Sequence, residues 1–108
     1  MDQINGDITR LKESDHLEVR LVQRDLHNLS KAIMEHEFKR IRVLDIQRNR
    51  VTELEGSVFM ALRNLQHLNA SKNCVERVSS EIRLCQELEK VILDDNMIRE
   101  LPEEIGQL

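Results

Sequence analysis

His36 and Glu37, in the stretch MEHEFKR, come closest in this sequence to a catalytic pair. In a zinc-protease helix of the HExxH type, a second histidine follows four residues after the first, so that both imidazoles bind the metal. Here the residue four positions after His36 is Arg40, so the second histidine ligand is missing. The pair therefore predicts no zinc site.

Two pairs of neighbouring acidic residues, Asp94–Asp95 and Glu103–Glu104, raise the question of acid–base chemistry. Carboxylates act as catalytic acids or bases where burial shifts their pKa. Neighbouring residues on a strand point to opposite faces, so we expect Asp94–Asp95 to be a solvated charged edge, and we interpret Glu103–Glu104 in a similar way. The three glycines are isolated and form no phosphate-binding loop, and no GxSxG motif occurs. The sequence thus predicts no catalytic residues, no cofactor and no metal.

The composition favours a compact domain that binds neither nucleic acid nor membranes. Of the 108 residues, 40% are apolar and 33% are charged, and the only aromatics are Phe38 and Phe59, so the core must be aliphatic. The net charge of −4 opposes binding to phosphate backbones, and aromatics for base stacking are scarce. The polar N-terminus is no secretory signal, and no run approaches the ~18 apolar residues of a membrane helix. We therefore predict a cytoplasmic protein with Cys74 and Cys85 reduced.

A repeated pattern of aliphatic residues and asparagines is the main signal in this sequence. The pattern reads LxxLxLxxNxLxxL and occurs as IRVLDIQRNRVTEL from Ile41, LQHLNASKNCVERV from Leu65 and LEKVILDDNMIREL from Leu88. Its asparagines are 24 and then 23 residues apart. A weaker copy, HLEVRLVQRDLHNL, has His16 in place of the first leucine and Arg24 in place of the asparagine.

The spacing within each copy has a physical reading. Two central aliphatic residues alternate with polar ones, which is the pattern of a short strand with one face inward, about three to five residues long. The asparagine follows at a turn, where its amide can donate to and accept from backbone groups that the turn leaves unpaired. We therefore expect stacked copies to form an asparagine ladder, with the next aliphatic residues in the same core.

These copies resemble the leucine-rich repeat family over about residues 16 to 108. The resemblance implies an α/β solenoid, with a parallel sheet of short strands on the concave face and helical or irregular segments on the convex face. The segment LEGSVFMALRNL resembles the longer repeat type, with Phe59 in a convex-side pocket. VSSEIRLCQEL and LPEEIGQL resemble the shorter form of intracellular Ras-associated repeats. In that alignment Cys85 is inward and His67 lies on the strand face, which argues against a zinc site with Cys74.

The sequence divides into an N-terminal cap, residues 1–15, and about four leucine-rich repeats, residues 16–108, of which the last is incomplete. Ile4, Ile8 and Leu11 recur at helical spacing, so we expect a short helical cap. No polar repeat is recognised at the other end, where a solenoid would show its apolar side to water. We expect that end to be covered by further repeats, by a partner or by a second copy of the chain.

The resemblance implies that partners bind the concave face, through the outward residues between the inward aliphatic ones. That face carries basic residues in the middle coils and acidic residues in the last, which orients a charged partner more than it raises affinity. Without Tyr or Trp as anchors, we expect a modest or extended interface. The predicted partner-binding residues are Arg20, Val22, Val43, Asp45, Gln47, Arg48, Arg50, His67, Asn69, Ser71, Lys72, Lys90, Ile92, Asp94 and Asp95.

The sequence therefore predicts a non-enzymatic protein-interaction module, a cytoplasmic signalling or assembly scaffold, that binds a protein partner on its concave face. One alternative is a regulatory or targeting region of an enzyme complex that contains a phosphatase, a kinase or a GTPase-linked protein. Another is a homodimer formed through the uncapped C-terminal end. Neither nucleic acid nor a membrane is an expected partner.

Overall fold

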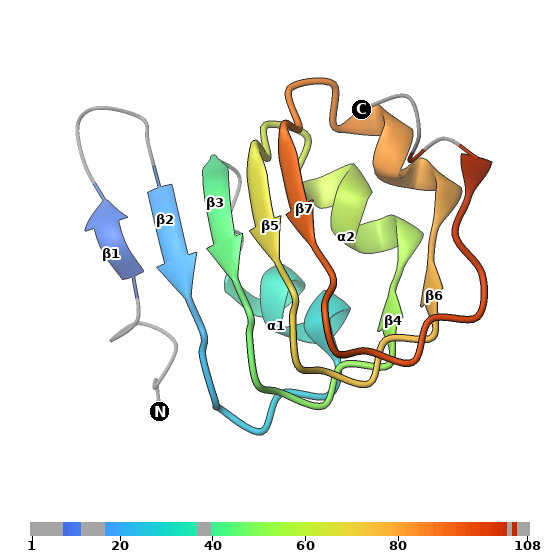
Figure 1. The fold of residues 1–108 in the computed structure, drawn as a ribbon. Coiled ribbons are helices and arrows are strands. Elements are labelled where there is room, and N and C mark those ends of the chain that lie inside the picture. The colour runs from blue at the N-terminus through green and yellow to red at the C-terminus, as the bar shows by residue number, and fades with distance from the viewer. Residues whose placement is uncertain (1–7, 12–16, 37–39, 104, 106–108) are drawn as a thin grey trace.

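The computed structural model describes residues 8–11, 17–36, 40–103 and 105, which form a stack of coils (Figure 1). In chain order, the elements are β1 (Ile8–Leu11), β2 (Leu17–Arg20), α1 (Leu29–His36), β3 (Ile41–Asp45), β4 (Glu53–Leu54), α2 (Gly56–Ala61), β5 (His67–Asn69), β6 (Arg77–Val78), the 3₁₀ helix η2 (Ser80–Leu84) and β7 (Lys90–Ile92). Strands β1, β2, β3, β5 and β7 form one sheet in that order, and β4 pairs with β6 in a second sheet. We number the coils first to fourth after the strands β2, β3, β5 and β7 that belong to them.

Parallel pairing puts the same repeat position of successive coils side by side. Leu44 of β3 is in register with Leu68 of β5, which is in register with Val91 of β7. Val19 of β2 lies opposite Leu44 on the other side. The predicted coil-upon-coil interior is therefore confirmed, with parallel strands of 3 to 5 residues.

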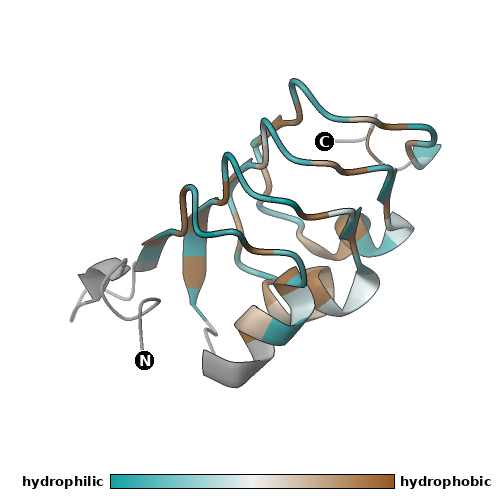
Figure 2. Ribbon diagram, turned by 90° about the horizontal axis from the view of Figure 1, so that it is seen from below, coloured by the Kyte–Doolittle hydropathy of each residue, from teal (hydrophilic) through white to brown (hydrophobic). Residues whose placement is uncertain are grey.

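One continuous, mostly aliphatic core lies between the sheet and the convex segments. In Figure 2, hydrophobic stretches recur in successive coils between the mostly hydrophilic turns and the convex segments. The buried members of the core are Val19, Leu21, Leu29, Ile33, Ile41, Leu44, Ile46, Val51, Leu54, Val58, Phe59, Leu62, Leu65, Leu68, Ala70, Val75, Val78, Ile82, Cys85 and Leu88. Removing this apolar surface from water is the main term that stabilises the fold, at roughly 25 cal/mol per Å².

The convex segments become shorter from coil to coil. They have 8 residues in α1, 6 in α2 and 5 in η2. Helix α2 and the 3₁₀ helix η2 approach each other closely at Gly56, where a Cβ atom would lie only 2.8 Å from Glu81 Oε1. Ser79 is the N-cap of η2, and its hydroxyl accepts a hydrogen bond from the backbone N–H of Glu81. Of the helices that the structure describes, none combines the length and the apolar character that crossing a bilayer requires.

An asparagine ladder holds the turns that follow the strands, as the sequence predicts. Asn73 Nδ2 donates to the carbonyl oxygen of Ile46 in the preceding coil (2.9 Å), and Asn73 Oδ1 accepts from the N–H of Val51 (3.1 Å). Asn49 and Asn96 make the same kinds of bond to the coils before them. Because each asparagine bonds its own coil and the one before it, the ladder has a direction along the chain.

The residue before each ladder position has a left-handed backbone. Its φ is 60° at Arg48, 58° at Lys72 and 58° at Asp95, and 56° at Gln23 in the first coil, where Arg24 stands in place of the asparagine. For a residue with a Cβ, this conformation costs roughly 1–2 kcal/mol. The stacked turns hold it nevertheless, because the hydrogen bonds of the ladder fix the backbone on both sides.

The predicted helical cap is wrong for Ile8–Leu11, which form the strand β1. This strand pairs antiparallel with β2, with Ile8 opposite Val19 and a register shift after Ile8. The pairing satisfies backbone N–H and C=O groups that β2 would otherwise leave open at the edge of the sheet, which local spacing cannot reveal. The other residues of the cap, 1–7 and 12–15, lie outside the described residues, and the division into a cap and repeats stays a prediction.

Candidate functional site

The outward residues of the four parallel strands form the concave face in the predicted rows. One row consists of Glu18, Val43, His67 and Lys90, and the next of Arg20, Asp45, Asn69 and Ile92. Past the strands, backbone bonds such as that from Arg48 N to the carbonyl oxygen of Ser71 (3.1 Å) continue the alignment. The placement of these residues on one face is as predicted, and their role in binding stays a prediction.

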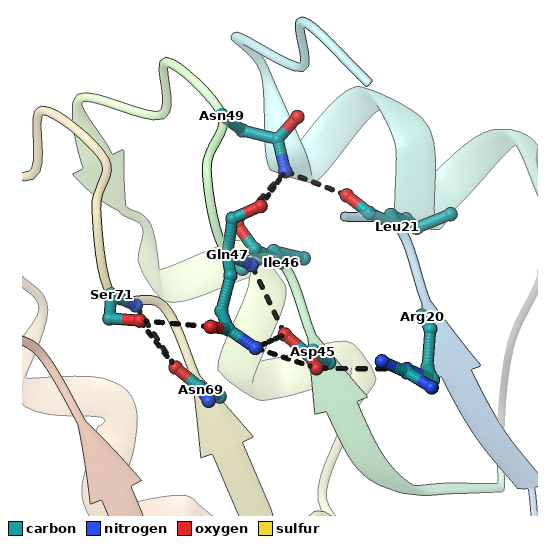
Figure 3. Close-up of polar contacts among 8 residues, drawn as sticks. All are labelled: Arg20, Leu21, Asp45, Ile46, Gln47, Asn49, Asn69 and Ser71. Carbon is teal, nitrogen blue, oxygen red and sulfur yellow. Dashed lines mark hydrogen bonds and ion pairs between the residues drawn. The ribbon is translucent and has the colours of Figure 1, made fainter. Parts of the chain in front are cut away.

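A polar network crosses the middle of this face (Figure 3). Gln47 Nε2 donates to both carboxylate oxygens of Asp45, at 2.9 and 3.0 Å. Arg20 Nε lies 3.8 Å from Asp45 Oδ2, and Ser71 Oγ donates to Asn69 Oδ1 at 2.9 Å. Ser71 Oγ also lies 3.5 Å from Gln47 Oε1, at the limit of a hydrogen bond. The network therefore links side chains of three neighbouring coils.

A depression of about 180 Å³ lies on the concave face over strands β3, β5 and β7. It is lined by Val43, Leu44, Asp45, His67, Leu68, Asn69, Lys90 and Ile92. Val43 and Ile92 are half-buried, whereas Lys90 is exposed. The depression thus brings together six of the predicted binding residues, and the strand register explains why they meet.

Charged residues of the turns pair between neighbouring coils. Lys72 Nζ lies 3.1 Å from Asp95 Oδ2, and Arg50 Nε lies 3.1 Å from Asp25 Oδ1. The predicted contrast between a basic middle and an acidic last coil is reduced, because Lys72 and Asp95 compensate each other. Arg48 is exposed, and within the described part of the chain it has no ion-pair partner.

Two glutamates at the border of the site were missed by the sequence reading. Glu89 Oε1 lies 3.6 Å from His67 Nε2, and Glu87 Oε1 lies 3.3 Å from one terminal nitrogen of Arg42. Both glutamates precede β7 and reach back to earlier strands. In this coil the rows begin at Lys90, after both glutamates, so they do not include these positions. Reading the residues just before each strand for charge would have found them.

The two cysteines differ in burial. Cys85 is fully buried and inward, as predicted, and its thiol donates to the carbonyl oxygen of Leu62 with the sulfur 3.2 Å away. Burial raises the pKa of the Cys85 thiol to about 11, although Arg63 opposes the shift. The thiol is therefore protonated and a poor nucleophile at neutral pH. Cys74 is half-buried, and among the described residues no group of three His, Cys, Asp or Glu could hold a metal ion.

A family model matches this chain in sequence, and a solved structure matches it in fold. A family model described as leucine rich repeat matches residues 39–98, more than half of the chain. No curated protein matches the sequence. A chain in the crystal structure of the BIR3–SERK2 complex from Arabidopsis thaliana matches with a TM-score of 0.69 at 20% identity, over 94% of this chain and 55% of that chain. This chain therefore spans about half the length of that relative, and at such low identity the likeness shows the fold alone.

Proposed function

Because the chain belongs to the leucine-rich repeat family, whose domains typically bind other proteins, we propose that it is a protein-interaction module that holds its partner on the concave face. One observation carries the proposal: outward side chains from four parallel strands lie in register on one face, and a hydrogen-bonded network already orders the middle of it. Ordering these groups in advance lowers the entropy that binding would otherwise cost.

The chemistry of the face supports a protein partner of extended shape. Val43 and Ile92 offer half-buried aliphatic surface, and the network between Arg20 and Asp45 offers polar contacts beside it. Protein interfaces combine apolar contacts with hydrogen bonds in this way. The depression of about 180 Å³ is too small to enclose a drug-sized ligand, for which pockets of roughly 300–1,000 Å³ are usual.

A pull-down from lysate tests the proposal. The double variant Arg48→Glu, Lys72→Glu reverses charge beside the face, and a partner steered by these residues should be captured at least several-fold less. Lys72 contributes one exposed ion pair at 3.1 Å, so its loss should cost no more than about 1 kcal/mol of stability. The matched control is Lys31→Glu, Arg63→Glu, which reverses two exposed charges on the convex side.

The expected result is loss of the same captured proteins from the concave variant and their retention by the control. Melting temperatures of both variants should stay within a few degrees of the original protein, which shows that folding is intact. Equal capture by the two variants would contradict concave-face binding.

The finer role that we propose is that of a cytoplasmic signalling or assembly scaffold of the intracellular, Ras-associated repeat type. The main alternative is a regulatory or targeting region in an enzyme complex that contains a phosphatase, a kinase or a GTPase-linked protein. Identifying the captured proteins by mass spectrometry separates these roles. A catalytic subunit as the direct partner favours the regulatory role, whereas several non-enzymatic partners favour a scaffold.

We propose secondly that the chain self-associates through its fourth coil, because apolar side chains are exposed there. Met97 and Leu101 are 60% and 49% exposed, and β7 is an edge strand, whereas β1 covers the opposite edge of the parallel strands. Sedimentation should therefore show a concentration-dependent dimer that the double variant Met97→Lys, Leu101→Lys abolishes. Met60→Lys, at a methionine that is 54% exposed in α2, should leave the dimer unchanged. A strict monomer at high concentration would contradict this proposal.

A further inference from the structure

The hydrogen-bond acceptors in the middle of the concave face are already engaged by neighbouring donors. The Asp45 carboxylate accepts from Gln47 Nε2 at 2.9 and 3.0 Å and from the backbone N–H of Gln47 at 3.2 Å, with Arg20 beside it. Asn69 Oδ1 accepts from the N–H and the hydroxyl of Ser71, at 3.1 and 2.9 Å. A partner that offered only donors would have to compete with these bonds.

The hydrogen-bond donors in the depression, in contrast, have few partners within the protein. Within the described part of the chain, no hydrogen bond or ion pair engages Lys90 Nζ or Asn69 Nδ2. Among the described residues, the His67 side chain has one ion-pair partner, Glu89 at 3.6 Å, and it is 45% exposed. Covering an unpaired donor costs free energy, because the donor loses its hydrogen bonds to water. A partner that covers these groups must therefore supply acceptors.

The register places charge and aliphatic surface at opposite corners of the depression. Val43, His67 and Lys90 lie side by side in one row, and Asp45, Asn69 and Ile92 in the next. The aliphatic corners are Val43 and Ile92, and the charged corners are Asp45 and Lys90. Neighbouring strands are about 4.8 Å apart, so Lys90 and Ile92 lie about two strand spacings from β3. Lys90 and Ile92 are two residues apart on the same strand, so their side chains lie on the same face. An anionic group near Lys90 is therefore adjacent to the aliphatic side chain of Ile92.

From this arrangement we infer that the depression binds an extended protein segment through an Asp or Glu side chain that has an aliphatic neighbour. Its carboxylate accepts from Lys90, Asn69 Nδ2 and His67, and its aliphatic neighbour packs on Ile92 or Val43. A passing side chain fits better than a chain end, because the depression is open and crosses three strands. A nucleic-acid backbone fits poorly, because it would bring several phosphates against Asp45 and Glu89 at the border of the site, whereas the proposed segment brings one carboxylate to Lys90. The inference rests on the proposed function of the concave face.

A titration followed by NMR on the ¹⁵N-labelled full chain tests this inference. The probes are three blocked pentapeptides, Ser-Val-Glu-Val-Ser and its relatives with Gln or Lys at the centre. The glutamate peptide should shift the side-chain amide signals of Asn69 and the backbone signals of Val43 and Ile92. The glutamine peptide should bind about two- to fivefold more weakly, as expected for loss of one exposed charge pair, and the lysine peptide more weakly still.

Two variants connect the preference to Lys90. In Lys90→Gln, the difference between the glutamate and glutamine peptides should disappear. In the control Lys31→Gln, on the exposed side of α1, the difference should persist. Equal binding of the two peptides by the original protein, a preference that survives in Lys90→Gln, shifts confined to other surfaces, or no shifts at millimolar peptide would each overturn the inference.

The outcomes separate this inference from the proposal beneath it. If the peptides fail but the double variant Arg48→Glu, Lys72→Glu still loses its partners in the pull-down, the concave face binds proteins by other chemistry. If the peptides fail and capture is also unaffected, both are wrong.

Discussion

Replacing Asn73 with alanine should lower the free energy of unfolding by about 2–4 kcal/mol. The largest contribution comes from the N–H of Val51, because Asn73 Oδ1, at 3.1 Å, is its acceptor and Val51 is fully buried. A buried donor left without a partner costs roughly 1–3 kcal/mol. The carbonyl oxygen of Ile46 is less affected, since it still accepts from Asn49 Nδ2 at 2.9 Å.

The remaining bonds of Asn73 add a smaller amount. Its Nδ2 also donates to the carbonyl oxygens of Ala70 and Ser71, both at 3.1 Å. Ala70 keeps the bond from Asn96 Nδ2 at 2.9 Å, and Ser71 keeps the bond from Arg48 N at 3.1 Å. Losing donors that have such substitutes costs on the order of 1 kcal/mol altogether, which gives the total above.

Urea unfolding followed by circular dichroism measures this change. The control is Asn64→Ala, an identical substitution at an exposed position between α2 and β5, which should change stability by less than about 0.5 kcal/mol. An unchanged m-value in Asn73→Ala would show that the coils of the variant still unfold together. A lower m-value would show that they no longer do, and that the ladder couples their unfolding in the original protein. If Asn73→Ala and Asn64→Ala lower the free energy of unfolding by the same amount, the ladder does not stabilise the fold.

Three further predictions follow from single side chains. Phe59→Ala, at the fully buried aromatic of α2, should cost about 3–5 kcal/mol in urea unfolding. Gln23→Gly should raise stability by up to about 1 kcal/mol, because φ is 56° there and glycine adopts it without a Cβ penalty; a loss would show that the turn is unstrained. Iodoacetamide at pH 8 should label Cys74 and spare Cys85 until the protein unfolds, as read by mass spectrometry. Because burial raises the pKa of the Cys85 thiol to about 11, its contribution to stability is present below the ordinary pKa of 9.0 and decreases as pH rises towards 11.

The solenoid could be predicted because its information is local and recurs. Leu44, Leu68 and Val91 stand at the same place in copies about two dozen residues apart, and equal places become neighbours once parallel strands stack. The strand β1 could not be predicted in this way. Ile8 and Leu11 are three residues apart, which is a helical spacing. The deciding factor was the open edge of β2, which no local pattern around Ile8 reveals.

The site was predictable in its rows but not in its contacts. Register follows from the repeat, so His67 and Lys90 had to be neighbours. Side-chain rotamers do not follow from it, so neither the bond between Gln47 and Asp45 nor the ion pair between Lys72 and Asp95 was foreseen. These contacts decide which groups on the face remain open, so the partner chemistry that we propose rests on the structure and not on the sequence.

The direction of the asparagine ladder gives the molecule a mechanical polarity. Asn96 anchors the turn before it, through the N–H of Val75 at 2.8 Å, and Asn73 does the same for Val51. Detaching the fourth coil would therefore leave the N–H of Val75 in the third coil without its acceptor, and detaching the third would do the same to Val51 in the second, whereas the pairing of β1 with β2 covers the other side. Pulled between its two termini, such a protein would come apart in steps from high residue numbers to low, and hydrogen exchange would advance through the backbone in the same order.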